Sequence, residues 1–505
     1  MVTFAGRWRQ AVASNPDGTF LVWEGPDGSV QTWTYAAFDD LVARTAGGLV
    51  ANGVERGSAI HLVLANSPAF VAVWLAATRL GAWIVPSDPQ ATPPELAGHI
   101  SRTKPALGVC AVAGRDTYLA AEPSMPVLAV DEDDTALDVL AGEPVSWRDR
   151  PEPAERDRAA VMFTSGTTSA PKGVVVTQAN YAFAGDVMAA AAGLGSDDRQ
   201  LVVLPMFHAN AQYYSFASAI SAGASVALMH AFSASQFLAQ AARHQATHAS
   251  LFAAPMRMIL ARGATPVDGL RLRHCWYAQN VTDDQYETLA SLLGCRPRQL
   301  YGMTETIPAV LTNRALDPVP SLMGEQTLGC EVDLRRQEDG APVAEGDVGE
   351  VVVHGDPGTT LFAEYLDDPA TTAASFRDGW FLTGDLATRD ADGRYAFAGR
   401  RSDVLKVAGE NVSVVEVEAV LAEHPSVLEA AVVGEPDPIR DEVPVGFVVQ
   451  HPDRPPVTTD ELLAWCETRL AKSKRPRRIE LVDELPRTSV GKIRKFMLKQ
   501  HEASA

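Results

Sequence analysis

The sequence predicts an α/β protein with largely parallel sheets in residues 1–400 and a smaller α+β domain in residues 401–505. Short apolar runs alternate with helical patterns along the first part of the chain, which is typical of parallel sheets covered by helices. The last part has a different pattern of predicted elements, with shorter strands and amphipathic helices. A chain of 505 residues is too long for a single hydrophobic core, so more than one domain is expected.

The individual elements follow from periodicity. We expect strands at residues 59–64, 82–85, 107–113 and 127–130 and a helix at 69–80. A second helix is indicated by apolar residues at helical spacing, namely Phe38, Leu41, Val42, Thr45 and Leu49. The segments 59–85 and 201–229 share one order of strand, loop, helix, Gly-Ala and strand, which indicates two related sheet subdomains. In the C-terminal part we expect helices at 413–421 and 459–471 and strands at 429–433 and 446–449.

Composition excludes several classes of protein. The net charge is −20, so the chain should repel nucleic acids and anionic membranes. The longest apolar run, residues 71–86, is too short to cross a bilayer, and the N-terminus lacks a signal-peptide pattern. The cysteines are few and form no Cys-x-x-Cys pair, which predicts a reducing, cytoplasmic location without a zinc site. They are Cys110, Cys275, Cys295, Cys330 and Cys466.

A loop rich in hydroxyls and glycine, "VMFTSGTTSAPKGVVVT" at residues 161–177, is the strongest chemical signal. Glycine lets a backbone approach a phosphate closely, hydroxyls donate hydrogen bonds, and lysine adds a positive charge. The residues that would cradle a polyphosphate are Thr164, Ser165, Gly166, Thr167, Thr168 and Lys172. A Walker A loop is excluded because Gly173 follows Lys172 and no helix pattern follows. The alternative is a Ser/Thr-rich hairpin turn without a ligand.

The same segment formally contains the Ser-x-x-Lys motif of β-lactamases at Ser169–Lys172. That motif needs a helical turn, which Pro171 disfavours for the residue before it. The companion Ser-Asp-Asn and Lys-Thr-Gly motifs do not follow. We therefore reject a serine-nucleophile function.

Further motifs lie downstream. "YGMTET" offers Tyr301 for stacking on a base, Thr304 for a phosphate and Glu305 for Mg²⁺, although a surface turn is the alternative. Asp385 follows a strand and can accept hydrogen bonds from ribose hydroxyls, and Arg400 lies at the domain junction. Lys492 follows a glycine near the C-terminus, where a solvated basic tail is the alternative. His208 follows a strand and can equally be a packed or capping residue.

In this order, "FTSGTTSAPKG", "YGMTET", "TGD", "GRRSDVLKVAGENVSVVEVE" and "PRTSVGKI" resemble the adenylate-forming superfamily of acyl-CoA synthetases, luciferases and adenylation domains. The resemblance implies a large N-terminal domain of two α/β sheet subdomains and a distorted β-barrel, with a small mobile C-terminal domain. It also implies two half-reactions. A carboxylate and MgATP give an acyl-adenylate, and a thiol then attacks it, so ATP, Mg²⁺ and coenzyme A are the expected cofactors.

The resemblance assigns roles residue by residue. Lys492 would bridge the carboxylate and the α-phosphate, and Glu305 would bind Mg²⁺. The catalytic set is Lys492, Thr304, Glu305 and His208. The ATP-binding set is Thr164, Ser165, Gly166, Thr167, Thr168, Lys172, Ala278, Gln279, Asn280, Tyr301, Gly302, Asp385 and Arg400. The CoA-binding set is Gly409, Glu410, Lys472, Lys474 and Arg475, and Ser402 would be the hinge.

Three positions depart from the family pattern. Ser169 replaces a glycine after the paired threonines, Ser402 stands where relatives carry Asp or Lys, and Val490 replaces a small residue before Gly491. The first should stiffen the phosphate loop. The second leaves the energetics of domain rotation open.

Several further segments resemble the carnitine/crotonobetaine–CoA ligase branch, among them "LRHCWYAQNVT" and "DPIRDEVPVGFVV". By this likeness a small or betaine-like acid would enter near His208, Asn210, Tyr213, Trp276 and Tyr277. Aromatic rings suit a quaternary ammonium group.

The thiol acceptor remains open between free CoA and a carrier-protein phosphopantetheine, and another nucleophile is also possible. The basic segment 471–478 suits the CoA phosphates, a docking face for a carrier protein, or a solvated loop. A non-catalytic nucleotide-binding protein is disfavoured because Lys492 and Glu305 are both present. No nucleic-acid or membrane partner is expected, and the chain is expected to be a monomer or homodimer.

Overall fold

The computed structural model describes residues 2–148, 150–164, 171–315, 317–401, 404–407, 410–438, 440–487 and 493–498. The chain divides into two compact units. The first comprises Met1–Ser165, Pro171–Val332 and Val353–Phe381, and the second comprises Gly166–Ala170, Asp333–Val352 and Leu382–Ala505. The predicted division at residue 400 into a nucleotide-binding domain and a mobile domain stays a prediction.

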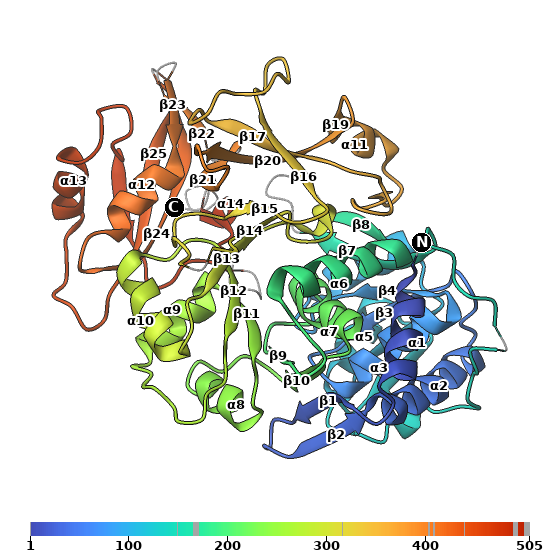
Figure 1. Cartoon of the computed structure of the whole chain (residues 1–505). Helices are drawn as coiled ribbons and strands as arrows, with labels where there is room; N and C mark the ends of the chain where they lie inside the picture. Colours follow the sequence, from blue (N-terminus) through green and yellow to red (C-terminus); the bar gives the residue numbers. More distant parts are fainter. Residues whose placement is uncertain are drawn as a thin grey trace. The chain divides into compact units, whose positions relative to one another are not determined.

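A seven-stranded sheet lies in the first unit, in the order β18-β8-β7-β4-β3-β5-β6. Figure 1 labels four of its strands, β3, β4, β7 and β8. Strands β3 to β7 run parallel, whereas β8 and β18 are antiparallel additions at one edge. Its strands are β3 (Ala59–Val63), β4 (Trp83–Pro86), β5 (Leu107–Ala111), β6 (Val127–Val130), β7 (Arg158–Thr164), β8 (Lys172–Thr177) and β18 (Glu364–Tyr365). The four strands expected in this region are confirmed.

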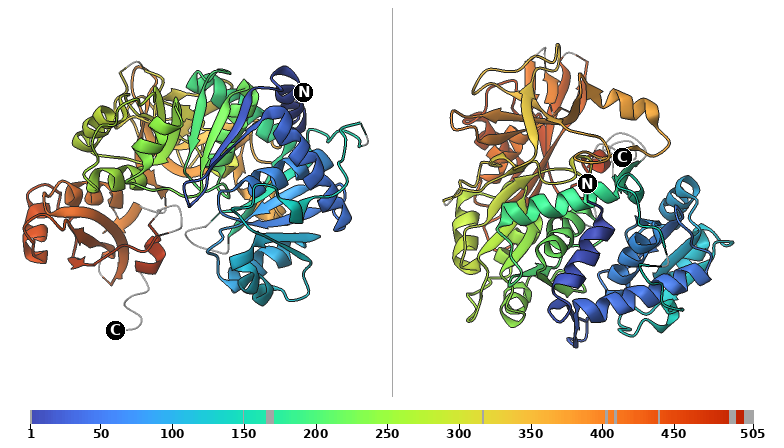
Figure 2. Two further views of the ribbon diagram at one scale, coloured as in Figure 1. Left: turned by 90° about the horizontal axis from the view of Figure 1, so that it is seen from below. Right: turned by 45° about the vertical axis from the view of Figure 1, so that its right-hand side comes forward.

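A nine-stranded sheet completes the first unit, in the order β15-β14-β13-β12-β11-β9-β10-β1-β2. Its centre is parallel, and both edges are antiparallel. Figure 2 shows its strands β9 to β13, in green and yellow-green, from two further sides. The strands are β1 (Thr19–Glu24), β2 (Val30–Thr34), β9 (Arg199–Val202), β10 (Ser225–Met229), β11 (His248–Phe252), β12 (His274–Ala278), β13 (Arg298–Tyr301), β14 (Leu311–Thr312) and β15 (Glu325–Gln326).

The repeated sequence pattern is a repeated structural unit. In one copy β3 and β4 are joined through helix α3, and in the other β9 and β10 are joined through η3 and α7. Both helical segments end at a glycine in the left-handed region, Gly81 with φ 67° and Gly223 with φ 69°. Glycine adopts this conformation without the steric cost that a Cβ carries. The Gly-Ala of each copy is therefore a helix stop that returns the chain to its sheet.

Helix α3 is buried along its whole length, as its mainly apolar sequence favours, and the burial includes Arg79 near its end. Its Trp74 contacts rings of three other helical segments, those of Phe4, Tyr181 and Phe216. The helices and helical turns of the first unit are α1 (Phe4–Ser14), α2 (Tyr35–Ala51), α3 (Pro68–Leu80), α4 (Pro93–Thr103), η1 (Val112–Gly114), α5 (Arg115–Ala121), η2 (Asp138–Leu140), α6 (Gln178–Ala192), η3 (Asn210–Ala217), α7 (Ser218–Ala222), α8 (Phe237–Arg243), α9 (Ala253–Ala261), α10 (Asp283–Leu293), η4 (Thr304–Thr306) and α11 (Pro369–Ala374).

A third sheet has five strands in the order β16-β17-β20-β19, with β21 paired to β20. Its strands are β16 (Glu331–Arg335), β17 (Gly349–His354), β19 (Phe376–Arg377), β20 (Trp380–Arg389) and β21 (Tyr395–Arg400).

The last sheet, in the second unit, has the order β23-β22-β25-β24, with β26 parallel to β25. Its strands are β22 (Val404–Val407), β23 (Glu410–Ser413), β24 (Val427–Asp437), β25 (Asp441–Gln450) and β26 (Arg478–Leu481), accompanied by α12 (Val414–Ala422), α13 (Thr459–Glu467) and α14 (Lys495–Leu498). The helix expected at 459–471 ends earlier, at Glu467, because the chain tightens there, with the N–H of Arg469 donating to the carbonyl of Cys466 at 3.2 Å. In the part of the chain that the structure describes, no helix has both the length and the apolar character needed to cross a membrane.

We expect Gly223→Ala to lower the thermal unfolding midpoint. Its φ of +69° strains any Cβ, although the nearest heavy atom to that Cβ, the Cβ of Ser196, lies 4.0 Å away. The cost of the left-handed conformation is about 1–2 kcal/mol. The matched control is Gly98→Ala in the exposed interior of α4, where nothing lies within 4 Å and φ is helical. It should stabilise the helix by roughly 0.5–1 kcal/mol. Equal shifts of the midpoint in both variants would contradict this assignment of the helix stop.

Candidate active site

The ends of β7 and β8 carry two of the predicted phosphate ligands. Thr164 and Lys172 are paired across the antiparallel β7–β8 ladder, on either side of residues 165–170. The neighbouring Gly173 is closely surrounded, because a Cβ there would lie 3.1–3.2 Å from side-chain atoms of Leu366, Phe163 and Val161. The predicted ligands Ser165, Gly166, Thr167 and Thr168 lie outside the described residues, as does the departure at Ser169.

Lys172 lies close to a second predicted residue, Glu305, through Tyr365. The Nζ of Lys172 lies 4.7 Å from the centroid of the Tyr365 ring. The Tyr365 hydroxyl donates a hydrogen bond of 3.0 Å to Oε1 of Glu305. Burial, followed by the Glu305 carboxylate, raises the pKa of Tyr365 above its ordinary value, so the phenol keeps its proton and remains a donor. A cation, a phenol and a carboxylate from three distant segments therefore form one cluster.

Backbone pairing explains why these segments meet. β18 adds to the edge of β8 in register, with Tyr365 opposite Val174. The N–H of Phe362 donates to the carbonyl of Glu305 at 2.9 Å, so the segment before β18 is tied to the turn that carries the carboxylate. Glu305 is 4% exposed. A buried carboxylate is stable only with partners, and Tyr365 supplies one.

The turn that presents Glu305 is strained. η4 follows the end of β13 and closes with Ile307 at φ 68° and ψ −74°, a conformation that β-branched residues rarely adopt. The side chain of Thr306 holds the turn, accepting from the N–H of Met303 at 3.0 Å. Such outliers persist where the surroundings hold them, and they cluster at ligand sites. Nothing in the residue pattern pointed to Ile307, so the sequence reasoning missed this feature.

A second strained residue follows the neighbouring strand. Gln279, directly after β12, has φ 75°. The side-chain amide of Gln299 on β13 donates to the carbonyl of Gln279 at 3.1 Å and to Oδ1 of Asn280 at 2.9 Å. The predicted nucleotide-binding segment Ala278–Asn280 is thus joined to the strand that ends in Tyr301. The carboxyl ends of parallel strands are where α/β sheets bind ligands.

In the second unit, Asp385 and Arg400 are joined to each other. They lie opposite one another on β20 and β21, and Nε of Arg400 lies 2.9 Å from Oδ1 of Asp385. Asp385 is 5% exposed, whereas the Arg400 side chain is 47% exposed. Each residue was predicted to contact the ribose, which stays a prediction, and the ion pair between them was not foreseen. Sequence reasoning also missed Glu350, which accepts from the N–H of Gly384 at 2.9 Å.

The residues predicted to hold the acid differ in environment. Trp276 and Tyr277 are successive residues of β12 and point to opposite faces of the sheet. Tyr277 packs in the core with Leu251 and Tyr286, and its hydroxyl donates to the carbonyl of Pro320 at 3.0 Å. The ring faces of Trp276 and Tyr277 therefore cannot both line one ligand pocket. Trp276 is on the other face of the strand.

Two buried polar atoms in this set have no hydrogen-bond partner among the described residues. They are Nε1 of Trp276 and Oδ1 of Asn210. Tyr213 is fully buried in η3, with its ring edge-on to Tyr181 at 5.4 Å. His208, half-buried, lies with its ring 4.6 Å from that of Phe207. An unpartnered donor and an unpartnered acceptor suit a polar ligand, since buried polar atoms are normally satisfied.

Of the predicted CoA ligands, Lys474 and Arg475 have partners within the protein. Lys474 forms an ion pair of 2.7 Å with Glu416, and Nε of Arg475 donates to the carbonyl of Leu470 at 3.0 Å. Lys472 is exposed. Exposed ion pairs are weak, so an anion can compete for Lys474. Four further predictions lie outside what the structure describes: Gly409, the side chain of Glu410, the predicted hinge Ser402 and the predicted catalytic residue Lys492.

Metal binding would fall to Glu305. Within the described ranges, no three His, Cys, Asp or Glu side chains gather into a metal cluster. Mg²⁺ is usually bound by one or two carboxylates together with phosphate oxygens, so a single buried carboxylate fits this ion.

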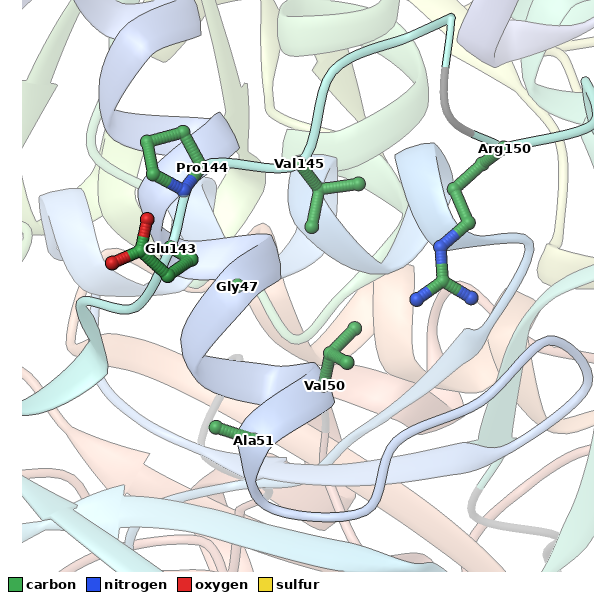
Figure 3. Close-up of a pocket in the computed structure, with 7 residues that line it drawn as sticks. All are labelled: Gly47, Val50, Ala51, Glu143, Pro144, Val145 and Arg150. Carbon is green, nitrogen blue, oxygen red and sulfur yellow. The ribbon is translucent and has the colours of Figure 1, made fainter.

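A surface hollow lies elsewhere in the first unit (Figure 3). Figure 3 shows its lining along α2 and the segment after η2, with Val50 and Val145 beside Arg150. None of the predicted site residues lines it. The candidate site is the strand-end cluster around Lys172, Tyr365 and Glu305.

We expect Tyr365→Phe to destabilise the first unit. The variant keeps the ring that faces Lys172 but removes the donor to the buried Glu305 carboxylate, at a cost of about 1–3 kcal/mol. Denaturant unfolding measures this loss. Tyr395→Phe is the matched control, because it removes a buried tyrosine hydroxyl on β21, in the second unit. An unfolding curve for Tyr365→Phe that overlays the wild-type curve would remove Tyr365 from the account.

Comparison with known proteins identifies the family. The model of the AMP-binding enzyme family matches residues 8–366, and that of the AMP-binding enzyme C-terminal domain matches residues 416–492. The chain is 32% identical to the crotonobetaine/carnitine–CoA ligase of Salmonella choleraesuis, over 97% of this chain and 98% of that protein. It is 33% identical to the enzyme of that name from Citrobacter koseri, over 95% and 96%.

Solved structures give the same result. ATP-bound MatB from Rhodopseudomonas palustris superposes with a TM-score of 0.89 at 26% identity, over 98% of both chains. The o-succinylbenzoate–CoA synthetase MenE from Bacillus subtilis, in complex with ATP and a magnesium ion, gives 0.84 at 28% identity, over 98% and 99%. The fold class and the family resemblance predicted from the sequence are confirmed. The chain belongs to the AMP-binding enzyme family.

Proposed function

We propose that the protein is an ATP-dependent, AMP-forming carboxylic acid–CoA ligase, which makes an acyl-adenylate and then an acyl-CoA thioester. The observation that carries the proposal is the similarity along the whole chain to relatives named as CoA ligases. The cluster of Lys172, Tyr365 and Glu305 supports it, because these side chains suit the charges of MgATP. The substrates are therefore a carboxylic acid, ATP with Mg²⁺, and coenzyme A.

The chemistry explains the charges. A carboxylate is a poor electrophile, and its attack on the α-phosphate brings two anions together. Cations and hydrogen-bond donors placed around the phosphates lower this barrier by neutralising charge as it develops. Thr164 and Lys172 flank the proposed phosphate loop, and Glu305 would hold Mg²⁺, which would neutralise phosphate oxygens when bound. Tyr301 would lie against the adenine, and Asp385 and Arg400 would serve the ribose.

The acid is proposed to be small and polar, or betaine-like. The relatives named as crotonobetaine/carnitine–CoA ligases support this substrate class. In the structure, the Trp276 indole N–H suits an acceptor on the acid, and Oδ1 of Asn210 suits a donor. The buried rings of Trp276 and Tyr213 offer the apolar faces that a quaternary ammonium group requires.

The acceptor is proposed to be free CoA. The alternative is a carrier-protein phosphopantetheine or another nucleophile, and kinetics with free CoA and with a loaded carrier would separate them. The basic segment around Lys472 and Lys474 suits the CoA phosphates. Five free thiols fit the proposed cytoplasmic location, since such thiols persist in a reducing compartment. A monomer or homodimer is proposed.

The test is ATP–pyrophosphate exchange with a panel of carboxylic acids, including betaine-type, short aliphatic and aromatic acids. At least one acid should support exchange, and adding CoA should convert it to a thioester. Absence of exchange with every acid, from protein that binds ATP, would favour the non-catalytic nucleotide-binding alternative.

Lys492 is proposed to act in adenylation and not in thioester formation. We expect Lys492→Ala to slow adenylation by about 10²–10³, because it removes one charge-stabilising contact in the transition state. Thioester formation from supplied acyl-adenylate should largely survive. Pyrophosphate exchange and single-turnover thioester formation measure the two steps, and equal losses in both would contradict the assignment.

The hinge gives a second expectation. Proline fixes φ near −65° and removes an N–H, so proline at the pivot should hold one of two arrangements. We expect Ser402→Pro to keep pyrophosphate exchange and to block thioester formation, with Asp403→Pro as the neighbouring control. If Asp403 is the pivot, Ser402→Pro will be nearly silent, and Asp403→Pro will keep pyrophosphate exchange and block thioester formation. Proportional loss of both activities in both variants would place the hinge elsewhere.

A further inference from the structure

Two side chains of α4 contact the ring of Phe163, one residue before Thr164. The imidazole of His99 stacks on it with centroids 4.1 Å apart and an interplanar angle of 3°. The guanidinium carbon of Arg102 lies 4.9 Å from the centroid of the same ring. His99 and Arg102 are three residues apart on one helix, so they project from the same side. Helix α4 thereby holds the end of β7 through an aromatic contact and a cation–π contact.

Arg102 also reaches the start of β8. Its Nη1 donates a hydrogen bond of 2.5 Å to the carbonyl of Pro171, the residue before Lys172. Phe163 pairs with Gly173 and Thr164 pairs with Lys172 in the β7–β8 ladder. One guanidinium therefore contacts both strands immediately beside the paired residues Thr164 and Lys172. A planar guanidinium can stack on a ring and donate to a carbonyl at once, which a lysine ammonium cannot do.

The stack is anchored in the sheet by a chain of hydrogen bonds. Nδ1 of His99 lies 2.8 Å from Oγ of Ser87, and the same Oγ lies 2.9 Å from Nε2 of His61. Nδ1 of His61 lies 2.9 Å from the hydroxyl of Tyr118. The Tyr118 hydroxyl, at the end of these hydrogen bonds, leaves no space beside Gly108, where a Cβ would lie 2.4 Å from it. The orientation of the His99 ring is thus set by Ser87, directly after β4, by His61 on β3 and by Tyr118 on α5.

The imidazoles of His99 and His61 are both neutral near pH 7. Burial lowers the pKa of His99 to about 4 and that of His61 to about 3. A neutral His99 does not repel Arg102, so the ring and the guanidinium can share the Phe163 ring.

We propose that Arg102 is a positioning residue for ATP: by joining the Phe163 ring to the Pro171 carbonyl, it fixes the ends of β7 and β8 from which Thr164 and Lys172 face the phosphates. This inference rests on the proposed function, since it assigns Thr164 and Lys172 to ATP. Arg102 acts through these two residues and does not itself touch the nucleotide. His99 and the chain behind it hold the Phe163 ring at a fixed place.

The test is the kinetics of ATP–pyrophosphate exchange by Arg102→Ala. We expect the KM for MgATP to rise about tenfold, the equivalent of one hydrogen bond from a charged group, with little change in kcat or in the KM for the acid. Arg102 is partly exposed, so truncation leaves no buried cavity, and the thermal midpoint should change little. A KM for MgATP equal to wild type, with exchange active, overturns the inference and leaves the proposed function intact. Absence of exchange in the wild type with every acid is instead a failure of the proposed function.

Arg158→Ala is the matched control. Arg158 lies at the other end of β7, where it also makes a cation–π contact, with the Trp83 ring at 5.9 Å, together with an ion pair of 3.0 Å with Glu364. Its KM for MgATP should equal that of the wild type, and an equal rise in both variants would show a general loss of strand stability and overturn the inference.

Arg102→Lys separates positioning from charge. Lysine keeps the charge but cannot stack and donate together, so the KM should remain raised. Full recovery of the KM in Arg102→Lys would show that only the charge matters and would also overturn the inference. If Arg102→Ala does not fold, the KM for MgATP of Arg102→Lys alone tests the inference.

Discussion

A buried carboxylate, that of Glu305, sets the arrangement of the candidate site. Taking a carboxylate out of water costs several kcal/mol unless donors and cations replace the lost hydration. The hydroxyl of Tyr365 replaces part of it, and the N–H of Phe362 fixes the backbone of the same residue. Because β18 pairs with β8, this requirement also places Lys172 beside the tyrosine ring. The need of one buried carboxylate for polar partners is thus met by segments that are far apart in sequence.

Backbone strain marks two strand ends of the nine-stranded sheet, one of them at the turn that carries Glu305. Gln279 and Ile307 follow the ends of the neighbouring strands β12 and β13, and both hold positive φ values, which cost about 1–3 kcal/mol each. Hydrogen bonds from Gln299 and Thr306 support the two turns. The strain is located where an α/β sheet presents its loops to ligands. A pre-set turn can then bind a nucleotide without further ordering.

The sequence predicted the fold class, the repeated β-α-β unit and the family, because these depend on periodicity, helix stops and the order of the motifs. Gly81 and Gly223 show this well, since the need for a left-handed residue is local. Tyr365 was not predicted, because its contact with Glu305 depends on an edge-strand pairing between distant segments. The ion pair of Asp385 and Arg400 was missed for the same reason. Trp276 and Tyr277 were grouped by proximity in sequence, but strand alternation separates them.

We propose that the Glu305 carboxylate binds the magnesium of MgATP, and the magnesium dependence of ATP–pyrophosphate exchange tests this proposal. Glu305→Gln keeps the size and the hydrogen-bonding oxygen at this position while removing the charge. The account predicts that ATP–pyrophosphate exchange by Glu305→Gln needs at least about tenfold more Mg²⁺ for half-maximal rate than the wild type, as expected for a lost charged ligand. The same magnesium dependence in both proteins, with exchange still active, would show that Glu305 is only structural and would contradict the account.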